Sequence, residues 1–380
     1  MGISWLLVIA VVVIFVQHRL FRRFGFHGLR IKRQFNQTHC HVGDEILMKE
    51  TIINSKLLPL PWLRLESMIP AGLRFGRQTN LEINRGALLQ NHRSLFSLMP
   101  YTKIVRSHPI LCAQRGWFKL DSAAVSIGDI VGLEAAVRTQ KTSLELLVYP
   151  KLLEVADIPL PSSSWQGDIV VKRWMLPDPF LSSGVREYRY GDAMSSIHWK
   201  ATARSGKLQV YNQEHTADPK LLILVNTQIT ETMWDAVSDP ELVEKALAYA
   251  ATMADYAIRQ GVPVGFGCNS YLLDQQGTPV FLAPQGGLPQ LHDLLESMAK
   301  LAMACSRTFH DYLENGMNLG SSTALDIVLI TAFQSAHIEE QIERLEWIGH
   351  SVYIIPLEHH LVDAAAEEVD TQHEVREAVV

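Results

Sequence analysis

Cysteine is scarce in this chain. The 380 residues contain four cysteines, Cys40, Cys112, Cys268 and Cys305, and no two of them form a C-x-x-C pair. A secreted disulfide framework is denser than this, and a structural zinc site supplies its ligands in closely spaced pairs. The sequence therefore predicts four reduced thiols, most of them buried.

Two further features are missing from the sequence, and their absence excludes classes of function. Lys and Arg number 34 against 40 Asp and Glu, a net charge of −6, so the basic excess of a general nucleic-acid binder is missing. No P-loop, nucleophile elbow or zinc-binding pattern occurs either. Two glycine-containing segments, Gly265-Phe266-Gly267 and Gly320-Ser321-Ser322, lack the lysine and the spacing of a phosphate-binding loop, and both are interpreted as turns.

The remaining composition is that of a globular protein. Hydrophobic residues make up 47% of the chain and charged residues 19%, which is enough apolar surface to form cores. Because single cores seldom grow beyond roughly 250–300 residues, a chain of this length is expected to contain two or three domains.

The N-terminus carries an apolar run at residues 5–16, WLLVIAVVVIFV. Twelve residues are too few for a span, but a helix over residues 2–21 would measure about 30 Å, with Gln17, His18 and Arg19 reaching into the headgroups. Positive charge follows the run instead of preceding it, which favours a signal anchor over a cleaved signal peptide or a core helix. The basic residues are Arg19, Arg22, Arg23, Arg30, Lys32 and Arg33. They predict a single-pass protein whose body is cytoplasmic, and they would allow residues 1–23 to contact membrane lipid.

Two patterns follow the anchor. Residues 28–150 contain short, partly alternating apolar runs at 46–54, 62–69, 94–99 and 144–150, typical of a β-sandwich. His39 and His41 are expected on one face of a strand, but without a second ligand pair they do not predict a metal site. Residues 219–360 alternate predicted strands (221–227, 262–268, 324–333, 350–357) with predicted helices (241–261, 288–303, 336–349), typical of a mainly parallel sheet. Residues 361–380 form an acidic tail.

The densest motif lies in the connecting segment 151–218. It reads SGVREYRYGDAMSSIHWKATARSGKLQVYNQE over residues 183–214. Asp192 is predicted to be the N-cap of a helix that Gly206 ends, with a strand following. Ile197 and Ala201 would share an apolar face, and Lys200 and Arg204 would share another.

This motif resembles the signature of the bacterial family catalogued as domain of unknown function 58. The matching positions are Arg186, Glu187, Tyr188, Gly191, Asp192, Ile197, Trp199, Lys200, Ala203 and Arg204. Residues 42–63 and 115–133 are also similar to the N-terminal β segment of that family. This copy departs from the family pattern at Ser195 and Ser196, where arginines are usual, and at His198.

The resemblance implies a von Willebrand A-like domain after the motif and genomic pairing with a MoxR-type AAA+ ATPase, sometimes beside other membrane proteins of the same operon. It suggests an adaptor or scaffold for complex assembly or envelope maintenance, not an enzyme. The metal-binding form of that domain has a D-x-S-x-S sequence after its first strand. The aligned positions here are Asn226, Gln228 and Thr230, with Asp326 the nearest later carboxylate, so no metal or other cofactor is predicted.

Three hypotheses result. The first is an α+β multidomain adaptor: a membrane anchor with its basic flank (1–27), a β-sandwich, the connecting segment, the von Willebrand A-like domain and the tail. Its signature residues would form a structural clasp in which Trp199 anchors the packing, or else a partner-binding surface. The second is a hydrolase or transferase that uses Glu187, Asp192, His198 and Lys200 as acid and base groups. The third is a metal-dependent adhesion-type receptor.

Overall fold

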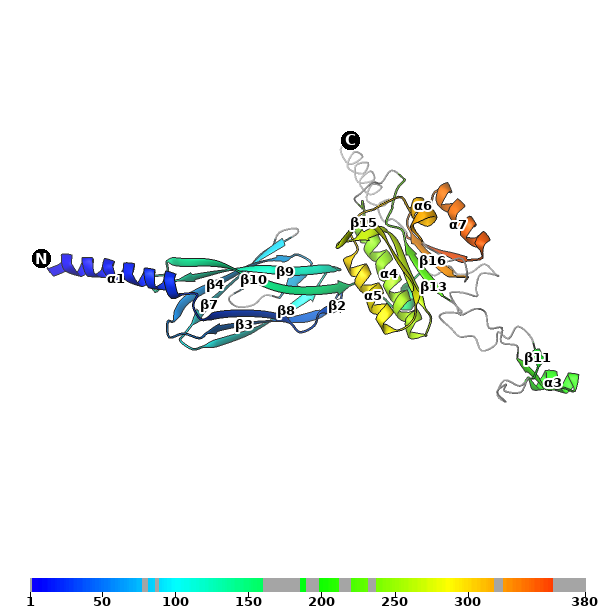
Figure 1. Ribbon diagram of the computed structural model, residues 1–380, viewed down its shortest axis with the longest axis horizontal. Coiled ribbons are helices and arrows are strands. Elements are labelled where there is room, and N and C mark those ends of the chain that lie inside the picture. The colour runs from blue at the N-terminus through cyan, green and yellow to red at the C-terminus, as the bar shows by residue number, and fades with distance from the viewer. Residues whose placement is uncertain are drawn as a thin grey trace, which may run out of the picture. The chain divides into compact units, whose positions relative to one another are not determined.

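The computed structural model describes residues 2–76, 81–85, 89–159, 185–188, 198–211, 220–231, 237–317 and 324–357. It separates into two compact units (Figure 1). The first comprises Met1–Leu152 together with Met298–Lys300, and the second comprises Leu153–Ser297 and Leu301–Val380. The predicted acidic tail at 361–380 and the segment Gly320-Ser321-Ser322 lie outside the described residues.

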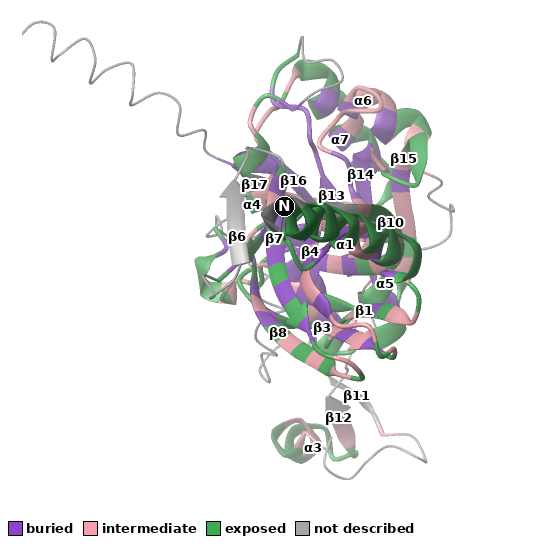
Figure 2. Cartoon of the chain, turned by 90° about the vertical axis from the view of Figure 1, so that its left-hand side faces the viewer, coloured by how far each residue is buried: buried purple, intermediate pink, exposed green. Residues whose placement is uncertain are grey.

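The first unit begins with helix α1, Gly2–Phe24. Its residues Trp5–Phe24 are long and apolar enough to cross a membrane, and only 6% of the most apolar window is buried. Figure 2 shows the exposed length of α1 in green. The helix is therefore as long as the sequence analysis requires, but Phe21 is only 1% exposed and belongs to the core of the strands that follow. Within the span expected at residues 2–21, Phe21 therefore packs against protein.

Two sheets follow α1 in the first unit. Their strands are β1 (Leu29–Phe35), β2 (His39–His41), β3 (Glu45–Asn54), β4 (Leu60–Pro70), β5 (Leu73–Phe75), β6 (Leu81–Arg85), β7 (Leu89–Leu98), β8 (Lys103–Cys112), β9 (Gly116–Gly128) and β10 (Glu134–Tyr149). One sheet has the order β1-β3-β8-β5 and the other β2-β10-β9-β4-β7-β6. All neighbours are antiparallel except β2, which runs parallel to β10.

The sheets face each other because their residues alternate between buried and exposed. In β3, for example, Ile46, Met48, Glu50, Ile52 and Asn54 point inward. Two apolar clusters form between the sheets, one around Ile52 and Leu65 next to α1 and one around Met48 and Ile69. Each cluster draws side chains from both sheets, as in a β-sandwich.

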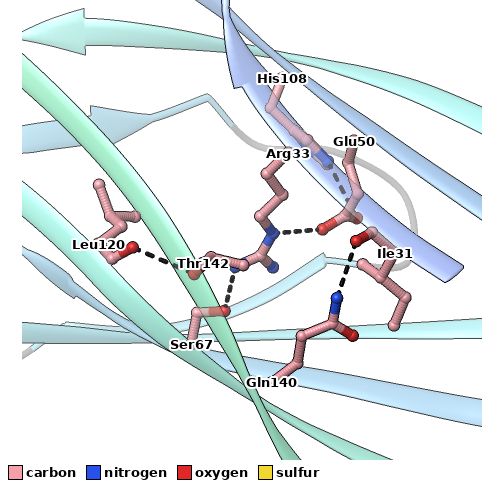
Figure 3. A network of polar contacts seen from close by, with 8 residues as sticks. All are labelled: Ile31, Arg33, Glu50, Ser67, His108, Leu120, Gln140 and Thr142. Carbon is pink, nitrogen blue, oxygen red and sulfur yellow. Dashed lines mark hydrogen bonds and ion pairs between the residues drawn. The ribbon is translucent and has the colours of Figure 1, made fainter.

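A polar network separates the two clusters (Figure 3). Arg33 Nε donates to Glu50 Oε1 at 2.7 Å, and Arg33 Nη1 donates to Ser67 Oγ at 2.6 Å. His108 Nε2 lies 3.7 Å from the second oxygen of Glu50. The side chains of Arg33 and Glu50 are 5% and 1% exposed, so this is a buried ion pair. The sequence analysis, which searched only for apolar alternation, did not find it.

The second unit holds a five-stranded sheet. Its elements are β13 (Leu221–Val225), α4 (Pro240–Arg259), β14 (Val264–Leu272), β15 (Gln275–Gln285), α5 (Leu288–Lys300), α6 (Phe309–Asp311), the π-helical turn η3 (Tyr312–Gly316), β16 (Asp326–Thr331), α7 (Ala336–Ile348) and β17 (Ser351–Pro356). The strand order is β15-β14-β13-β16-β17, and β15 alone is antiparallel to its neighbour. The same unit contains η1 (Val155–Asp157), β11 (Val185–Glu187), α3 (Trp199–Ser205) and β12 (Gln209–Tyr211).

Local sequence explains the principal helices of this sheet. Asp239 caps α4 by accepting from the amides of Glu241 and Leu242, and Pro240 occupies the first turn, where its missing N–H costs nothing. Ser335 caps α7 in the same way, and Gly349 ends it with φ 106°. The predicted helices and strands of this segment are all present. Strand β15 was not predicted, because its sequence QQGTPVFLAPQ has no clear alternation.

The prediction of a turn at Gly265-Phe266-Gly267 is wrong, because all three residues lie inside β14. Neither glycine serves a turn. A Cβ at Gly265 would lie 2.6 Å from the carbonyl oxygen of Leu282, and one at Gly267 would meet Tyr312 and Leu224. Both glycines therefore permit close packing within the strand.

Candidate functional site

The first candidate site is the carboxyl edge of the parallel sheet. Strand β13 lies between β14 and β16: the chain passes from β13 to β14 on one side and, after β15, returns to β16 on the other. In open α/β sheets ligands bind beyond the carboxyl ends of the strands at such a switch point. The residues that follow β13 are Asn226, Thr227, Gln228, Ile229 and Thr230, which include all three predicted positions.

Asn226 connects the ends of two strands. Its Nδ2 donates to Thr331 Oγ1 at 3.0 Å and to the carbonyl oxygen of Phe333 at 3.4 Å, both at the end of β16. Its Oδ1 accepts from the amide of Gln228 at 2.9 Å. Asn226 is 3% exposed, and its side-chain amide forms its hydrogen bonds with the protein. In a metal-binding domain a carboxylate would occupy this position.

Gln228 is similarly engaged. Its Oε1 accepts from the amide of Phe309 at the start of α6, at 3.0 Å, and its Nε2 donates to the carbonyl oxygen of Thr230 at 3.1 Å. The side chain therefore holds the loop after β13 against α6. Of the three predicted positions, Asn226 and Gln228 are brought together by the fold, whereas Thr230 lies at the exposed end of the loop.

Asn269 in β14 completes this edge and was not predicted. Its Oδ1 accepts from both the amide and the hydroxyl of Thr227, each at 2.9 Å, and its Nδ2 donates to the carbonyl oxygen of Arg307 at 3.2 Å. Thr227 and Asn269 are fully buried. A polar residue inside the otherwise apolar run of β14 was the signal that could have identified it.

The donor set does not fit a divalent cation. Mg²⁺ in such domains needs a carboxylate and hydroxyls, whereas side-chain amides occupy the first two positions and already bond the main chain and the Thr331 hydroxyl. Asp326, the later carboxylate considered above, starts β16 opposite Leu221 and therefore lies at the other edge of the sheet, which corrects that suggestion. Within the described parts of the chain, no three His, Cys, Asp or Glu side chains converge as a metal site.

His39 and His41 both contact Tyr149, as expected for two residues on one face of a strand. The ring of His39 stacks on Tyr149 with centroids 5.5 Å apart, and His41 meets it edge-on at 5.4 Å. His41 Nδ1 also lies 2.8 Å from the carbonyl oxygen of Pro150.

The second candidate site is the signature segment, whose described parts fold into a small module. Strands β11 and β12 pair antiparallel, with Arg186 opposite Val210 and Glu187 opposite Gln209. Tyr188 donates its amide to the carbonyl oxygen of Leu208 at 2.9 Å. The module therefore brings the Arg-Glu-Tyr part of the signature beside the strand that follows α3. Gly191, Asp192 and Ile197 lie outside the described residues.

Helix α3 begins later than predicted and ends where predicted. Its N-cap is His198, whose Nδ1 accepts from the amide of Ala201 at 3.1 Å, so the assignment of Asp192 as the cap is wrong. The helix starts later because His198 also donates its own amide to Gln209 and so joins β12. Gly206 ends the helix with φ 68°, as predicted.

The outward side of α3 is aromatic and basic. Trp199 is 66% exposed, so the prediction that it anchors the packing is wrong. Lys200 and Arg204 are exposed one helical turn apart, and α3 contains no acidic residue. His198, Lys200, Ala201, Arg204, Ser205 and Gln209 line one open groove.

The chain thus combines an apolar N-terminal helix, a two-sheet β unit and an α/β unit that carries the signature, which makes it an α+β multidomain protein. Residues 184–365 match the family model described as "Protein of unknown function DUF58". This confirms the resemblance deduced from the signature: over these residues the chain belongs to the DUF58 family.

A relative of the chain is "Uncharacterized protein YeaD" from Bacillus subtilis (strain 168). It is 22% identical over 238 residues, which make up 62% of this chain and 57% of the relative. The chain therefore matches little more than half the length of that protein. Neither the family description nor the name of the relative includes an enzymatic activity.

Solved structures match about a third of the chain. A non-cellulosomal cohesin from Archaeoglobus fulgidus covers 31% of the chain and 89% of its own length, at 9% identity and a TM-score of 0.22. The α2-macroglobulin of Escherichia coli covers 33% of the chain and 10% of its own length, at 13% identity and a TM-score of 0.26. Scores this low carry no information about function.

Proposed function

We propose that this protein is a membrane-anchored scaffold that binds a protein partner on the cytoplasmic side of the membrane. The anchor is α1. Its apolar residues 5–16 are exposed, unlike those of a core helix, and its C-terminal end is part of the folded sandwich, unlike a signal peptide that is removed. The basic residues Arg19, Arg22 and Arg23 support a cytoplasmic location of the two units.

The observation that carries the binding role is the exposure of Trp199 beside Lys200 and Arg204. A large apolar ring is costly to leave in water, and tryptophan and arginine are the residues most often responsible for affinity at protein interfaces. With two cations and no carboxylate on the same helix, this surface suits an acidic partner.

The partner that we propose is a MoxR-type AAA+ ATPase, on the basis of family membership. The second unit supports a von Willebrand A-like assignment, since its order β15-β14-β13-β16-β17 has one antiparallel edge strand next to a parallel sheet. In this chain the sheet edge that would hold a cation in such a domain is instead closed by Asn226, Gln228 and Asn269. The proposed contact is therefore the module rather than a metal-bridged interface.

The test is site-specific photocrosslinking in native membranes. A photoreactive phenylalanine derivative replaces Trp199 in the full chain, and crosslinked products are identified by mass spectrometry with and without ATP. A matched control places it at Trp347, an exposed tryptophan on α7 of the same unit. An AAA+ ATPase crosslinked from position 199 and not from position 347 would support the proposal.

The proposal fails if position 199 yields no protein crosslink under either nucleotide condition while the chain remains in the membrane. A non-ATPase protein crosslinked there would retain the scaffold role and overturn the choice of partner. Lys200→Glu together with Arg204→Glu should abolish the crosslink if an acidic surface is recognised, because the cations that attract it become repulsive.

A further inference from the structure

Helix α1 and the sandwich are joined without a flexible linker. The apolar run ends at Val16, and His18, two residues later, already contacts the sandwich: its Nδ1 lies 3.1 Å from Oδ2 of Asp129 in the β9–β10 turn. Phe21 then enters the core. At about 1.5 Å per helical residue, only about 3 Å of helix separates the apolar run from the first contact with the sandwich.

The C-terminal end of α1 is held from a second direction. Lys56, in the β3–β4 loop, donates its ammonium group to the carbonyl oxygens of Phe24 and Gly25 at the C-terminal end of α1. Ser55 donates its amide to Gly28 at 2.9 Å. The helix therefore leaves the sandwich as a rigid extension of it (Figure 1).

Three turns surround this point. The β3–β4 loop binds the end of α1 directly, and the β7–β8 turn is fixed to that loop because Tyr101 donates its amide to the carbonyl oxygen of Lys56 at 3.3 Å. The β9–β10 turn is fixed to α1 through Asp129. All three therefore lie at the end of the sandwich from which α1 emerges.

These turns expose apolar side chains instead of polar ones. The residues concerned are Leu57, Met99, Tyr101, Ile130, Val131 and Leu133, which are between 54% and 74% exposed. We call this set the apolar rim. Tyr101 has φ 53° and is the one non-glycine residue with positive φ in the described chain. Surface turns normally carry polar residues, so a group of six apolar residues around one helix indicates that the rim contacts something other than water.

The position of the rim along α1 identifies what the rim contacts. The apolar run of α1 ends at Val16, and His18, about 3 Å further along the helix, already contacts the turn that carries Ile130 and Val131. When the apolar run lies in the hydrocarbon core, the rim is therefore at the membrane interface. The rim is the surface nearest to the end of that run, and Arg19, Arg22 and Arg23 follow on the exposed sides of α1, at the depth of anionic headgroups.

We propose that the apolar rim is inserted into the membrane interface, so that the sandwich sits on the bilayer with its long axis fixed by α1. This inference rests on the proposed anchoring role of α1. It assigns the rim to lipid rather than to a protein partner, because the rigid junction leaves no distance in which a partner could be placed between the rim and the membrane.

The test uses the full chain in lipid nanodiscs. An environment-sensitive fluorescent amino acid is encoded in separate variants at Val11, at Ile130 and at Leu111, and quenching by lipids with spin labels in the headgroup or acyl region is measured. Leu111 is the control: it is an exposed leucine at the far end of β8, ten residues from Tyr101 and thus about 33 Å along the strand.

We expect the probes at Val11 and Ile130 to lose fluorescence with lipid quenchers and the probe at Leu111 to keep it. Quenching at Val11 without quenching at Ile130 would overturn the rim inference and leave the anchor intact. No quenching at either position would refute the anchor itself. A probe at Ile130 that is shielded from water yet unaffected by lipid quenchers would indicate a protein contact, including a second copy of this chain, and would also overturn the inference.

A variant provides an independent check. Replacing Ile130, Val131 and Leu133 by serine should leave the chain in the membrane through α1 but abolish quenching of a probe at Tyr101. The matched change Leu111→Ser should have no effect. Persistent quenching at Tyr101 in the triple variant would contradict the proposed insertion.

Discussion

His18 Nδ1 and Asp129 Oδ2 lie 3.1 Å apart, although 111 positions separate the two residues in the sequence. The second oxygen of Asp129 accepts from the amide of Leu133 at 2.9 Å, and Asp129 is fully buried. One carboxylate thus shapes the β9–β10 turn and also holds the last turns of α1.

Asp129→Ala should loosen both elements. Losing a buried acceptor leaves the Leu133 amide unpaired, which costs about 1–3 kcal/mol. We expect faster amide hydrogen exchange over residues 129–133 and over residues 18–25, measured by mass spectrometry. His18→Ala is the control and should affect mainly the helix, because the His18 side chain is 34% exposed. Unchanged protection in both segments of Asp129→Ala would contradict this role.

The Arg33–Glu50 pair should make the sandwich sensitive to acid. Burial raises the pKa of Glu50, but the neighbouring His108 and the charge and hydrogen bond of Arg33 together outweigh it, so that the pKa lies below its usual range. Because the pKa of Glu50 is lower in the folded state than in the unfolded state, where it is about 4.3, the ionised carboxylate stabilises the folded sandwich above that pH. This stabilisation is lost as the pH falls through the pKa of the folded state.

Glu50→Gln should remove this part of the acid dependence. It should also lower the free energy of unfolding at neutral pH by about 3–5 kcal/mol, because Arg33 would remain buried without its counter-charge. Thermal unfolding between neutral pH and about pH 3 would measure both effects. Glu66→Gln is the control, since Glu66 belongs to a more exposed pair with Arg93. An acid dependence of Glu50→Gln that matches the native chain would refute the assignment.

Asn226→Asp tests the closed edge of the parallel sheet. The change keeps the shape but removes the Nδ2 donor to Thr331 and places a carboxylate where the side chain is 3% exposed. We expect a loss of about 1–3 kcal/mol in the free energy of unfolding from the unmet hydrogen bond and the desolvated charge. Adding Mg²⁺ should not restore it, because Gln228 remains bonded to Phe309. Stabilisation that follows Mg²⁺ concentration would show instead that this edge retains a cation-binding geometry.

Gly267→Ala should destabilise the second unit. The new Cβ would meet the Tyr312 hydroxyl and lie 2.7 Å from Leu224 Cδ2, and Tyr312 is held in place because it donates to the carbonyl oxygen of Val280 at 2.8 Å. Overpacking of this kind costs about 1–3 kcal/mol. Gly286→Ala is the matched control, since its Cβ would contact nothing within 4 Å. Equal midpoints of denaturant unfolding for the two variants would contradict the close packing described for β14.

Much of the second unit could be predicted because its signals are local. Asp239 and Pro240 at the start of α4, followed by apolar residues at helical spacing, predict this helix. Gly349 likewise predicts the end of α7. Strand β13 is buried along its whole length, so its apolar run identifies it without any knowledge of neighbours. The signature likewise identified the family from consecutive residues.

The errors concern residues whose roles depend on distant partners. Asp192 and His198 are both acceptable helix caps, and only the hydrogen bond from His198 to Gln209 decides between them. Trp199 was expected to pack and is exposed, because an apolar ring in a sequence does not show which side of its helix meets protein. Gly267 suggests a turn from sequence alone, whereas in the fold it lies within a strand where only a glycine leaves room for Tyr312.

The sequence by itself determined an apolar N-terminal helix, alternating β strands, an α/β segment and the family, because each depends on residues within one element or one motif. Tertiary structure alone decided that Phe21 is a core residue of the sandwich, that Cys40 and Cys112 place their sulfur atoms 3.2 Å apart, and that three separate turns form one apolar rim. Such groupings arise when strands distant in the chain pair in a given register, and no local pattern encodes that pairing.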